Sequence, residues 1–280
     1  MASSAGKAES GVRTGRVQAG TAGWLGAGDP STRVSEGKAP ALLALHGFGG
    51  TPVEVELLVE VAGRLGLAAR APLLPGHGTH PRDLGRTRYR DWLRGAEDAL
   101  SELFTAHGEA PVIVCGLSMG SLLALELSLR YPERVARLVL LANALWLRSP
   151  FPERALAFAD RLGLPDFQVP KQASDLGDPA ARRTHLTYAA QPLHAAISLH
   201  RAAKALRPRL SEVTCPTFIV HGARDRLCPV ANADRAARGL TSAEVEVLIL
   251  PRSHHILTRD VERSELAERL TASLRPLTAH

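Results

Sequence analysis

The chain contains few aromatic residues and very little lysine. Phe, Trp and Tyr together make up 4% of its 280 residues, and lysine occurs only at positions 7, 38, 171 and 204. The formal net charge of +6 therefore comes almost entirely from arginines, which are interleaved with acidic residues along the chain. Nucleic-acid-binding surfaces combine clustered basic residues with stacking aromatics. The sequence thus argues against a nucleic-acid partner and offers no localised basic patch for an anionic surface.

Long apolar runs and cysteine motifs are also missing. No stretch of about 18 apolar residues occurs, so we predict no stable membrane insertion. The three cysteines, Cys115, Cys215 and Cys228, form no CxxC pair, and the histidines show no HExxH spacing, so we predict neither a disulfide framework, a metal site nor a cofactor. The first twenty residues are small and polar without an apolar core, which argues against a secretory signal. We expect a cytoplasmic protein with reduced thiols.

Short apolar runs alternate with glycine-rich turns and helical periodicities. Strands are predicted at 40–47, from 67, and at 111–116, 134–144, 216–222 and 245–251, with helices at 52–65, 89–107, 118–131, 229–239 and 261–274. Strands that alternate with helices form a mostly parallel sheet with helices on both faces. We therefore predict the α/β class, and 45% apolar residues suffice for its core.

The alternation stops after Trp146 and returns near residue 209. Between them, prolines divide what we predict to be short helices. We expect residues 39–145 and 209–280 to form the core, 146–208 a small helical lid, and 1–38 a flexible segment. The apolar spacing in 151–165 fits a lid helix lining an acyl pocket and equally the buried face of an ordinary helix.

The strongest motif is Gly116-x-Ser118-x-Gly120, placed between a strand and a helix. A turn this sharp strains its central residue and requires small neighbours two positions away. It would expose Ser118 Oγ and leave the Met119 N–H, at a helix N-terminus, free to bind an anion. The alternative is an ordinary glycine turn.

A second glycine-rich stretch, residues 45–52, follows the first strand. Its glycines would let the backbone approach a ligand, and the Phe48 N–H could be a second donor to an oxyanion. We expect His46 to orient this loop and not to act as a base. A simple turn without a ligand is the alternative.

Asp225 lies just past a predicted strand, where a carboxylate can orient an imidazole; a helix-capping aspartate is the alternative. Two histidines, His254 and His255, follow the next strand. Serine needs a nearby base that is itself oriented by a third group. The order Ser118, Asp225, histidine is that of α/β-hydrolases, and all three parts follow strand carboxyl ends.

The chain resembles the α/β-hydrolase superfamily, and within it the small bacterial carboxylesterases related to monoacylglycerol lipases. The matching stretches are 42–50, 71–84, 89–93, 115–120, 216–229 and 253–260. The resemblance implies Ser118 as nucleophile, Asp225 as the group that orients the base, and Phe48 and Met119 N–H as the oxyanion hole.

The resemblance also distinguishes the two histidines. The group's last motif is similar to Ser-x-His with an acidic residue five positions later, which Ser253, His255 and Asp260 match. It implies His255 as the base, with His254 as the alternative. Ser121 replaces a glycine that is frequent in the family, a change that the turn should tolerate. His77 and His80 are expected to be structural.

The expected activity is cofactor-free hydrolysis of small-molecule carboxylic esters, with short-to-medium acyl chains or a monoacylglycerol-like structure, through an acyl-enzyme. Thioesterases and C–C hydrolases on the same fold are alternatives, since fold and triad are common to them. A non-catalytic binding protein is an alternative of another class. The serine at the elbow argues against family members that use an aspartate nucleophile. Both a monomer and a dimer are compatible with the sequence.

Overall fold

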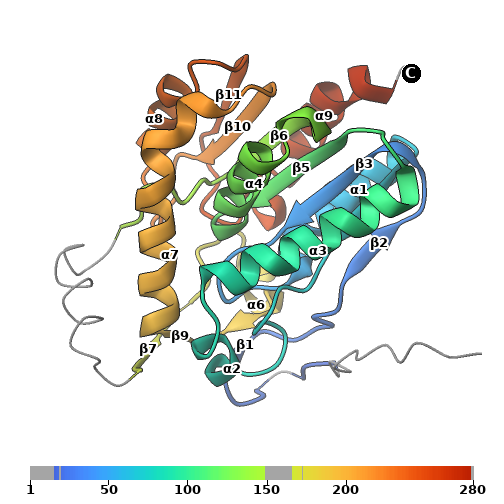
Figure 1. The fold of residues 1–280 in the computed structure, drawn as a ribbon. Coiled ribbons are helices and arrows are strands. Elements are labelled where there is room, and N and C mark those ends of the chain that lie inside the picture. Colours follow the sequence, from blue (N-terminus) through green and yellow to red (C-terminus); the bar gives the residue numbers. More distant parts are fainter. Residues whose placement is uncertain (1–15, 19, 149–165, 172, 279–280) are drawn as a thin grey trace, which may run out of the picture.

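A central sheet organises the protein (Figure 1). The computed structural model describes residues 16–18, 20–148, 166–171 and 173–278. Among these residues, the largest sheet has seven strands in the order β11-β10-β6-β5-β3-β4-β2, and only the β2–β4 pair is antiparallel. The strands are β2 (Arg33–Ser35), β3 (Lys38–Leu45), β4 (Leu67–Ala71), β5 (Val112–Leu117), β6 (Val135–Leu141), β10 (Thr217–Gly222) and β11 (Val245–Leu250).

Helices cover both faces of this sheet. One face packs against α1 (Glu56–Arg64) and α9 (Arg263–Leu274), and the other against α3 (Tyr89–His107), α4 (Met119–Arg130), α7 (Leu193–Leu206) and α8 (Ala231–Gly239). Leu42 and Leu43 on β3 enter opposite apolar clusters because successive strand side chains alternate between the faces.

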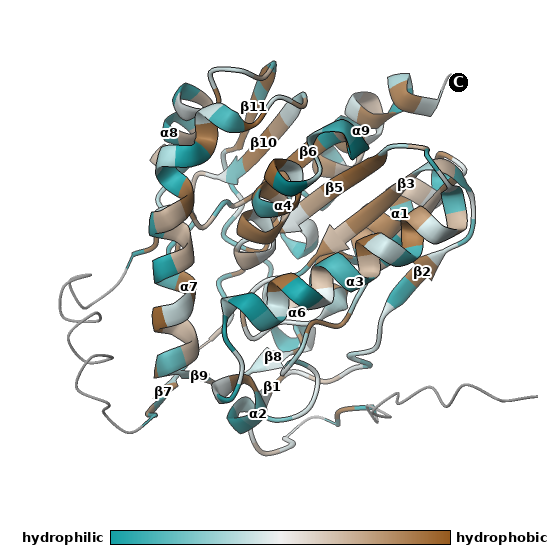
Figure 2. Cartoon of the chain, viewed as in Figure 1, coloured by the Kyte–Doolittle hydropathy of each residue, from teal (hydrophilic) through white to brown (hydrophobic). Residues whose placement is uncertain are grey.

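The hydropathy pattern agrees with these two layers. The central strands are apolar along their length, whereas the outer helices carry polar residues on their exposed sides (Figure 2). Every predicted core strand and helix is present, with ends shifted by a few residues. The helix predicted from residue 52 begins as a 3-10 turn, Pro52–Val55, before α1. The predicted α/β class with a mostly parallel, doubly covered sheet is confirmed.

The segment predicted to be a lid of short helices contains short strands as well as helices. Its described part contains α6 (Pro179–Thr184) and α7, together with the short strands β7 (Gln168–Pro170), β8 (Thr187–Tyr188) and β9 (Ala190–Pro192). β7 pairs with β9, and β8 pairs with β1 (Trp24–Leu25). Strands of two or three residues are too short to give a periodic sequence signal. The stretch 151–165 lies outside the described residues.

Part of the predicted flexible N-terminal segment belongs to the folded structure. Trp24 is buried, and its ring lies 4.7 Å from that of Tyr188. β2 forms the edge of the central sheet beside β4. The segment from Trp24 to Lys38 therefore differs from the predicted flexible tail, because one buried aromatic and one edge strand tie it down.

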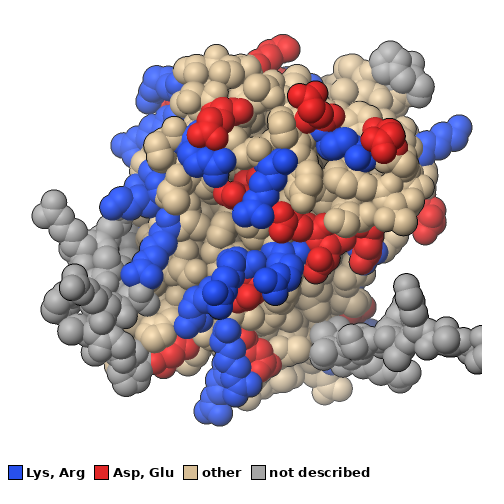
Figure 3. Space-filling model, in the orientation of Figure 1, with Lys and Arg blue, Asp and Glu red and all other residues tan. Residues whose placement is uncertain are grey.

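Surface charge and helix hydropathy can be compared with the predictions of no nucleic-acid partner and no membrane insertion. On the face shown in Figure 3, Lys and Arg side chains are interleaved with Asp and Glu side chains. Within the described ranges, no helix combines the length and the apolarity that a bilayer crossing requires.

Candidate active site

Ser118 occupies a strained turn between β5 and α4. Its φ of +55° and ψ of −115° are unfavourable for a residue with a side chain. A Cβ on Gly116 would lie 2.0 Å from Gly120 O, and a Cβ on Gly120 would lie 2.0 Å from Leu45 O. Only glycine fits at these two positions, so the predicted elbow is formed by backbone contact on both sides of the serine.

Ser121 fixes the elbow from the helix side. Its hydroxyl donates to Ser118 O at 2.5 Å and accepts the Ala144 N–H at 3.2 Å. The residue that departs from the family pattern therefore links the elbow to the segment that follows β6.

Two neutral histidines hold the glycine-rich stretch 45–52, which we call the glycine loop. His46 Nε2 accepts the Leu74 N–H and its Nδ1 donates to Gly47 O. His77 Nε2 accepts the Gly49 N–H and its Nδ1 donates to Pro75 O. Burial lowers the pKa of His46, and it lowers that of His77 to about 3. Both rings therefore act as neutral supports at ordinary pH. His80 caps α2 (Pro81–Gly85).

A buried carboxylate that the sequence analysis missed ties the glycine loop to the lid segment. Glu54 accepts the Gly47 N–H at 2.9 Å and lies 2.9 Å from His185 Nε2, whose Nδ1 lies 2.6 Å from Ser174 Oγ. Burial by itself raises the pKa of Glu54, but the hydrogen bond and charge of His185, with smaller effects from His46 and Lys171, lower it to about 2. This pair spans 131 positions, so no local sequence pattern reveals it.

Asp225 meets His255 at the carboxyl ends of β10 and β11. His255 Nδ1 lies 2.8 Å from Asp225 Oδ2, while Asp225 Oδ1 accepts the N–H groups of Leu227 and Cys228, each at 2.8 Å. Burial lowers the pKa of His255, but the charge of Asp225 and the hydrogen bond to it outweigh this and raise the pKa well above the usual value. The same contacts overcome burial at Asp225 and lower its pKa.

The sequence analysis also missed His221. Its Nε2 lies 3.1 Å from Asp225 Oδ2, the oxygen that faces His255. His221 is fully buried on β10, four residues before Asp225. It contacts Oδ2, whereas the backbone donors bind Oδ1. The signal in the sequence was the short spacing of four residues between His221 and Asp225.

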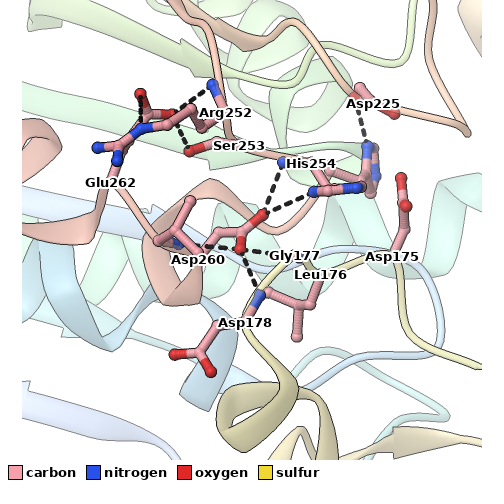
Figure 4. Close-up of polar contacts among 12 residues, drawn as sticks. Asp175, Leu176, Gly177, Asp178, Asp225, Arg252, Ser253, His254, Asp260 and Glu262 are labelled. Carbon is pink, nitrogen blue, oxygen red and sulfur yellow. Dashed lines mark hydrogen bonds and ion pairs between the residues drawn. The ribbon is translucent and has the colours of Figure 1, made fainter.

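The neighbouring His254 faces a different carboxylate (Figure 4). Its N–H donates to Asp260 Oδ2 at 2.6 Å, and its Nδ1 lies 3.3 Å from the same oxygen. Asp260 Oδ1 accepts the N–H groups of Gly177 and Asp178 in the lid segment, at 2.8 and 2.9 Å. Asp260 thus fastens residues 252–262, which we call the histidine loop, to the lid segment. The geometry pairs Asp225 with His255 and leaves His254 in a structural contact.

One cavity is lined by three of the predicted site residues, whereas Asp225 and Met119 do not line it. Ser118, Phe48 and His255 line it together with apolar side chains from Leu147, Leu199, Leu227 and Ile256 and with charged ones that include Arg148, Lys171 and Asp175. Within the described part of the chain, no hydrogen bond joins Ser118 to His255. Such contacts are often long in ligand-free sites and shorten when substrate binds. The arrangement can bring a serine, an imidazole–carboxylate pair and an apolar group of a ligand together.

Two proteins of known activity are similar to this chain over most of its length. The thermostable monoacylglycerol lipase of Bacillus sp. (strain H-257) is 30% identical over 228 residues, covering 81% of this chain and 87% of that lipase. The carboxylesterase of Bacillus subtilis (strain 168) is 23% identical over 236 residues, covering 84% of this chain and 92% of the esterase.

A solved structure and a family match agree with these similarities. The structure reported for the metagenome-derived lipolytic enzymes LipS and LipT has a TM-score of 0.81 and 28% identity, covering 89% of this chain and 98% of its own. Residues 38–262 match the Hydrolase_4 family, described as serine aminopeptidase, S33. The elbow, the strand order and these matches together lead to one conclusion: the chain belongs to the serine aminopeptidase S33 family of the α/β-hydrolase superfamily.

Proposed function

We propose that this protein cleaves carboxylic esters through an acyl-enzyme, with Ser118 as nucleophile, His255 as general base and Asp225 orienting the base. The broader statement, that it is an ester-hydrolysing enzyme, follows from the family match and from relatives with that activity. The observation that carries the finer proposal is the 2.8 Å contact of His255 with Asp225 at a cavity that Ser118 also lines.

The proposed reaction uses each contact in turn. Ser118 Oγ attacks the ester carbonyl while His255 Nε2 takes its proton, and Asp225 holds the Nδ1–H and stabilises the imidazolium. His255 then protonates the leaving alcohol. It next removes a proton from water, which attacks the acyl-enzyme and releases the acid. The two buried partners of Asp225 Oδ2 keep this carboxylate in one orientation throughout.

The oxyanion is held by backbone donors in this proposal. Met119 is the first residue of α4, where an N–H has no acceptor within the helix. Phe48 lies in the glycine loop at the cavity wall. Supports from His46, His77 and Glu54 keep the second donor loop in place before substrate binds, as a preorganised site requires.

The leucine and isoleucine side chains in the cavity wall favour an ester with an acyl chain, and the lipase relative supports a monoacylglycerol-like substrate. Thioesters remain the alternative because the same residues would serve them. Hydrolysis of p-nitrophenyl acetate, butyrate and octanoate, compared with a matched acyl thioester and an amino-acid p-nitroanilide, separates ester, thioester and peptidase activity. More efficient turnover of the thioester or the anilide than of every ester would overturn the substrate class.

The roles of the residues are tested with p-nitrophenyl butyrate and variants at equal folded concentration. Ser118→Ala and His255→Ala should each lower kcat on the order of 10⁴-fold or more, because the members of such a unit depend on one another. His254→Ala is the matched control and should keep activity within about 10-fold, since it loses a structural contact alone. Loss of activity in His254→Ala but not in His255→Ala would reverse the assignment.

The activity should also depend on pH with a definite sign. His255 must be neutral to accept the serine proton, and its pKa lies above the usual histidine value in the free enzyme. We therefore expect kcat/KM to rise with pH through an apparent pKa above about 6.5. A profile already flat from pH 5 upward contradicts this.

A further inference from the structure

Cys228 has no part in the proposed reaction, yet it lies against the residues that do. A thiol, a carboxylate oxygen and a ring nitrogen from Cys228, Asp225 and His255 all lie within 4.8 Å of one another, and all three residues are buried. These are three donors of the kinds that bind transition metals. They come from two loops, at the ends of β10 and β11, that the core sheet holds side by side.

The three donor atoms lie close enough together for one metal ion to bind all of them. Asp225 Oδ1 accepts two backbone N–H groups. Oδ2, which lies 2.8 Å from His255 Nδ1 and 3.1 Å from His221 Nε2, is therefore the oxygen that would bind the ion. In a tetrahedral zinc site, bonds of about 2.0–2.3 Å place neighbouring donors roughly 3.3–3.7 Å apart. Shifts on the order of 1 Å would bring the three donors into that geometry.

We propose that Asp225, Cys228 and His255 form a binding site for thiophilic divalent ions such as Zn²⁺ and Cd²⁺, and that occupation of this site inhibits the enzyme. The binding itself depends only on the three donors, whereas the inhibition rests on the proposed role of His255 as base. A water or an anion reaching in from the cavity would complete the coordination, because His255 and Leu227 line that cavity.

Inhibition follows from the proton accounting. The thiol of Cys228 loses its proton to solvent and binds as thiolate. His255 exchanges its Nδ1 proton for the metal and carries a proton on Nε2 instead. An imidazole in that state can no longer accept the proton of Ser118. Asp225, bound to the metal, also ceases to orient the ring. The ion therefore removes the base without touching the nucleophile.

The donor set predicts selectivity and a slow onset. Thiolate and imidazole prefer Zn²⁺ and Cd²⁺ to the hard ions Mg²⁺ and Ca²⁺, which take oxygen ligands. Cys228 is fully buried, so the loop that carries it must open before the ion binds. Inhibition should therefore develop over time after mixing and be reversed by a chelator.

The first test measures binding without using activity. Cd²⁺ is titrated into full-length Ser118→Ala protein, and the ultraviolet absorption of the Cd–thiolate bond is recorded. We expect one such band per chain, which disappears in Ser118→Ala with Cys228→Ser and persists with Cys215→Ser, a matched change at another buried cysteine. Adding His255→Gln should weaken the binding. A band that survives Cys228→Ser, or is absent from the parent protein, overturns the site.

The second test measures inhibition of enzyme with the native serine. Each variant's rate with Zn²⁺ is compared with its own metal-free rate. Losing an outer partner of a metal already costs about 10–100-fold in affinity, so Cys228→Ser should raise the half-inhibiting Zn²⁺ concentration by at least about 10-fold. Equal sensitivity of Cys228→Ser and Cys215→Ser to Zn²⁺, or inhibition by Mg²⁺ equal to that by Zn²⁺, overturns the proposal. If Cys228→Ser does not fold, Cys228→Ala takes its place. A wild type without esterase activity but with the Cd–thiolate band rejects the function and keeps the site.

Discussion

The elbow of Ser118 and the histidine loop lie at the same edge of the sheet. Close backbone contacts hold the elbow, whereas hydrogen bonds to buried carboxylates hold the loop. At the elbow, Gly116 and Gly120 let backbone approach backbone with no room for a side-chain carbon. In the histidine loop, buried carboxylates hold the chain. Asp260 binds N–H groups of two segments, and Glu262 accepts the Arg252 N–H and the Ser253 hydroxyl. Steric fit therefore fixes the elbow that carries Ser118, and buried charge fixes the loop that carries His255.

The difference predicts which perturbation each part resists. A contact between backbones is indifferent to pH but intolerant of added volume. A buried carboxylate can be replaced by an amide of the same size without a steric clash. Its hydrogen bonds weaken, however, when its charge is removed. The contact of Glu54 with the glycine loop belongs to the second kind. Substitutions and pH can therefore be used to separate the two kinds of support.

The largest effect is expected from Gly120→Ala. The new Cβ would lie 2.0 Å from Leu45 O, which is backbone and cannot rotate away. We expect a loss of more than about 4 kcal/mol in the free energy of unfolding and no measurable esterase activity. Gly108→Ala is the control, because its φ of +62° is strained but no atom lies within 4 Å. It should cost only about 1–3 kcal/mol. Equal losses for the two in denaturant unfolding would show that contact is not the cause.

Asp260→Asn tests the part held by charge. The amide keeps the volume but loses the ionised acceptor of the Gly177, Asp178 and His254 N–H groups. We expect a loss of about 3 kcal/mol in unfolding free energy, with a lower kcat as the loop loosens. Asp29→Asn removes an exposed carboxylate that accepts the Ser31 N–H, and it should change stability by less than about 1 kcal/mol. Unchanged stability in Asp260→Asn would mean that the loop is held by packing.

Acid should weaken the protein through Glu54. Its pKa is lowered from 4.5 to about 2, so its contribution to stability is complete above pH 4.5 and disappears as the pH falls toward 2. Urea unfolding of Glu54→Gln between pH 5 and 2 should show a shallower loss than the wild type. Glu56→Gln removes a carboxylate paired with Arg33 and controls for net charge; it should follow the wild-type curve.

The smallest effect is expected at Ser121. Ser121→Ala removes the hydroxyl that bonds Ser118 O and the Ala144 N–H, and should cost about 1 kcal/mol with a few-fold loss of kcat. Ser128→Ala removes a hydroxyl on the same helix that bonds only Leu125 O. It should lower stability by no more than the first change and leave kcat as it is. A kcat that falls equally in both would remove any special role of Ser121 at the elbow.

The same division explains what the sequence could predict. The elbow was predictable because its sequence pattern lies within five consecutive residues, from Gly116 to Gly120. The parallel sheet was predictable because each strand is a short apolar run. The pairs Glu54–His185 and Gly177–Asp260 were not, because they join residues 131 and 83 positions apart and each residue alone is compatible with a surface position. Long-range contacts made by buried carboxylates can be recognised only once the fold is known.

The bond from Asp260 to Gly177 has a consequence for the order in which the protein becomes active during synthesis. Domains are made from the N-terminus at about 5–20 residues per second. The residues of the elbow and the glycine loop are translated early, while Asp260, which fastens the histidine loop, is among the last residues to be added. A chain terminated before residue 253 would therefore carry Ser118 without the histidine that we propose as its base.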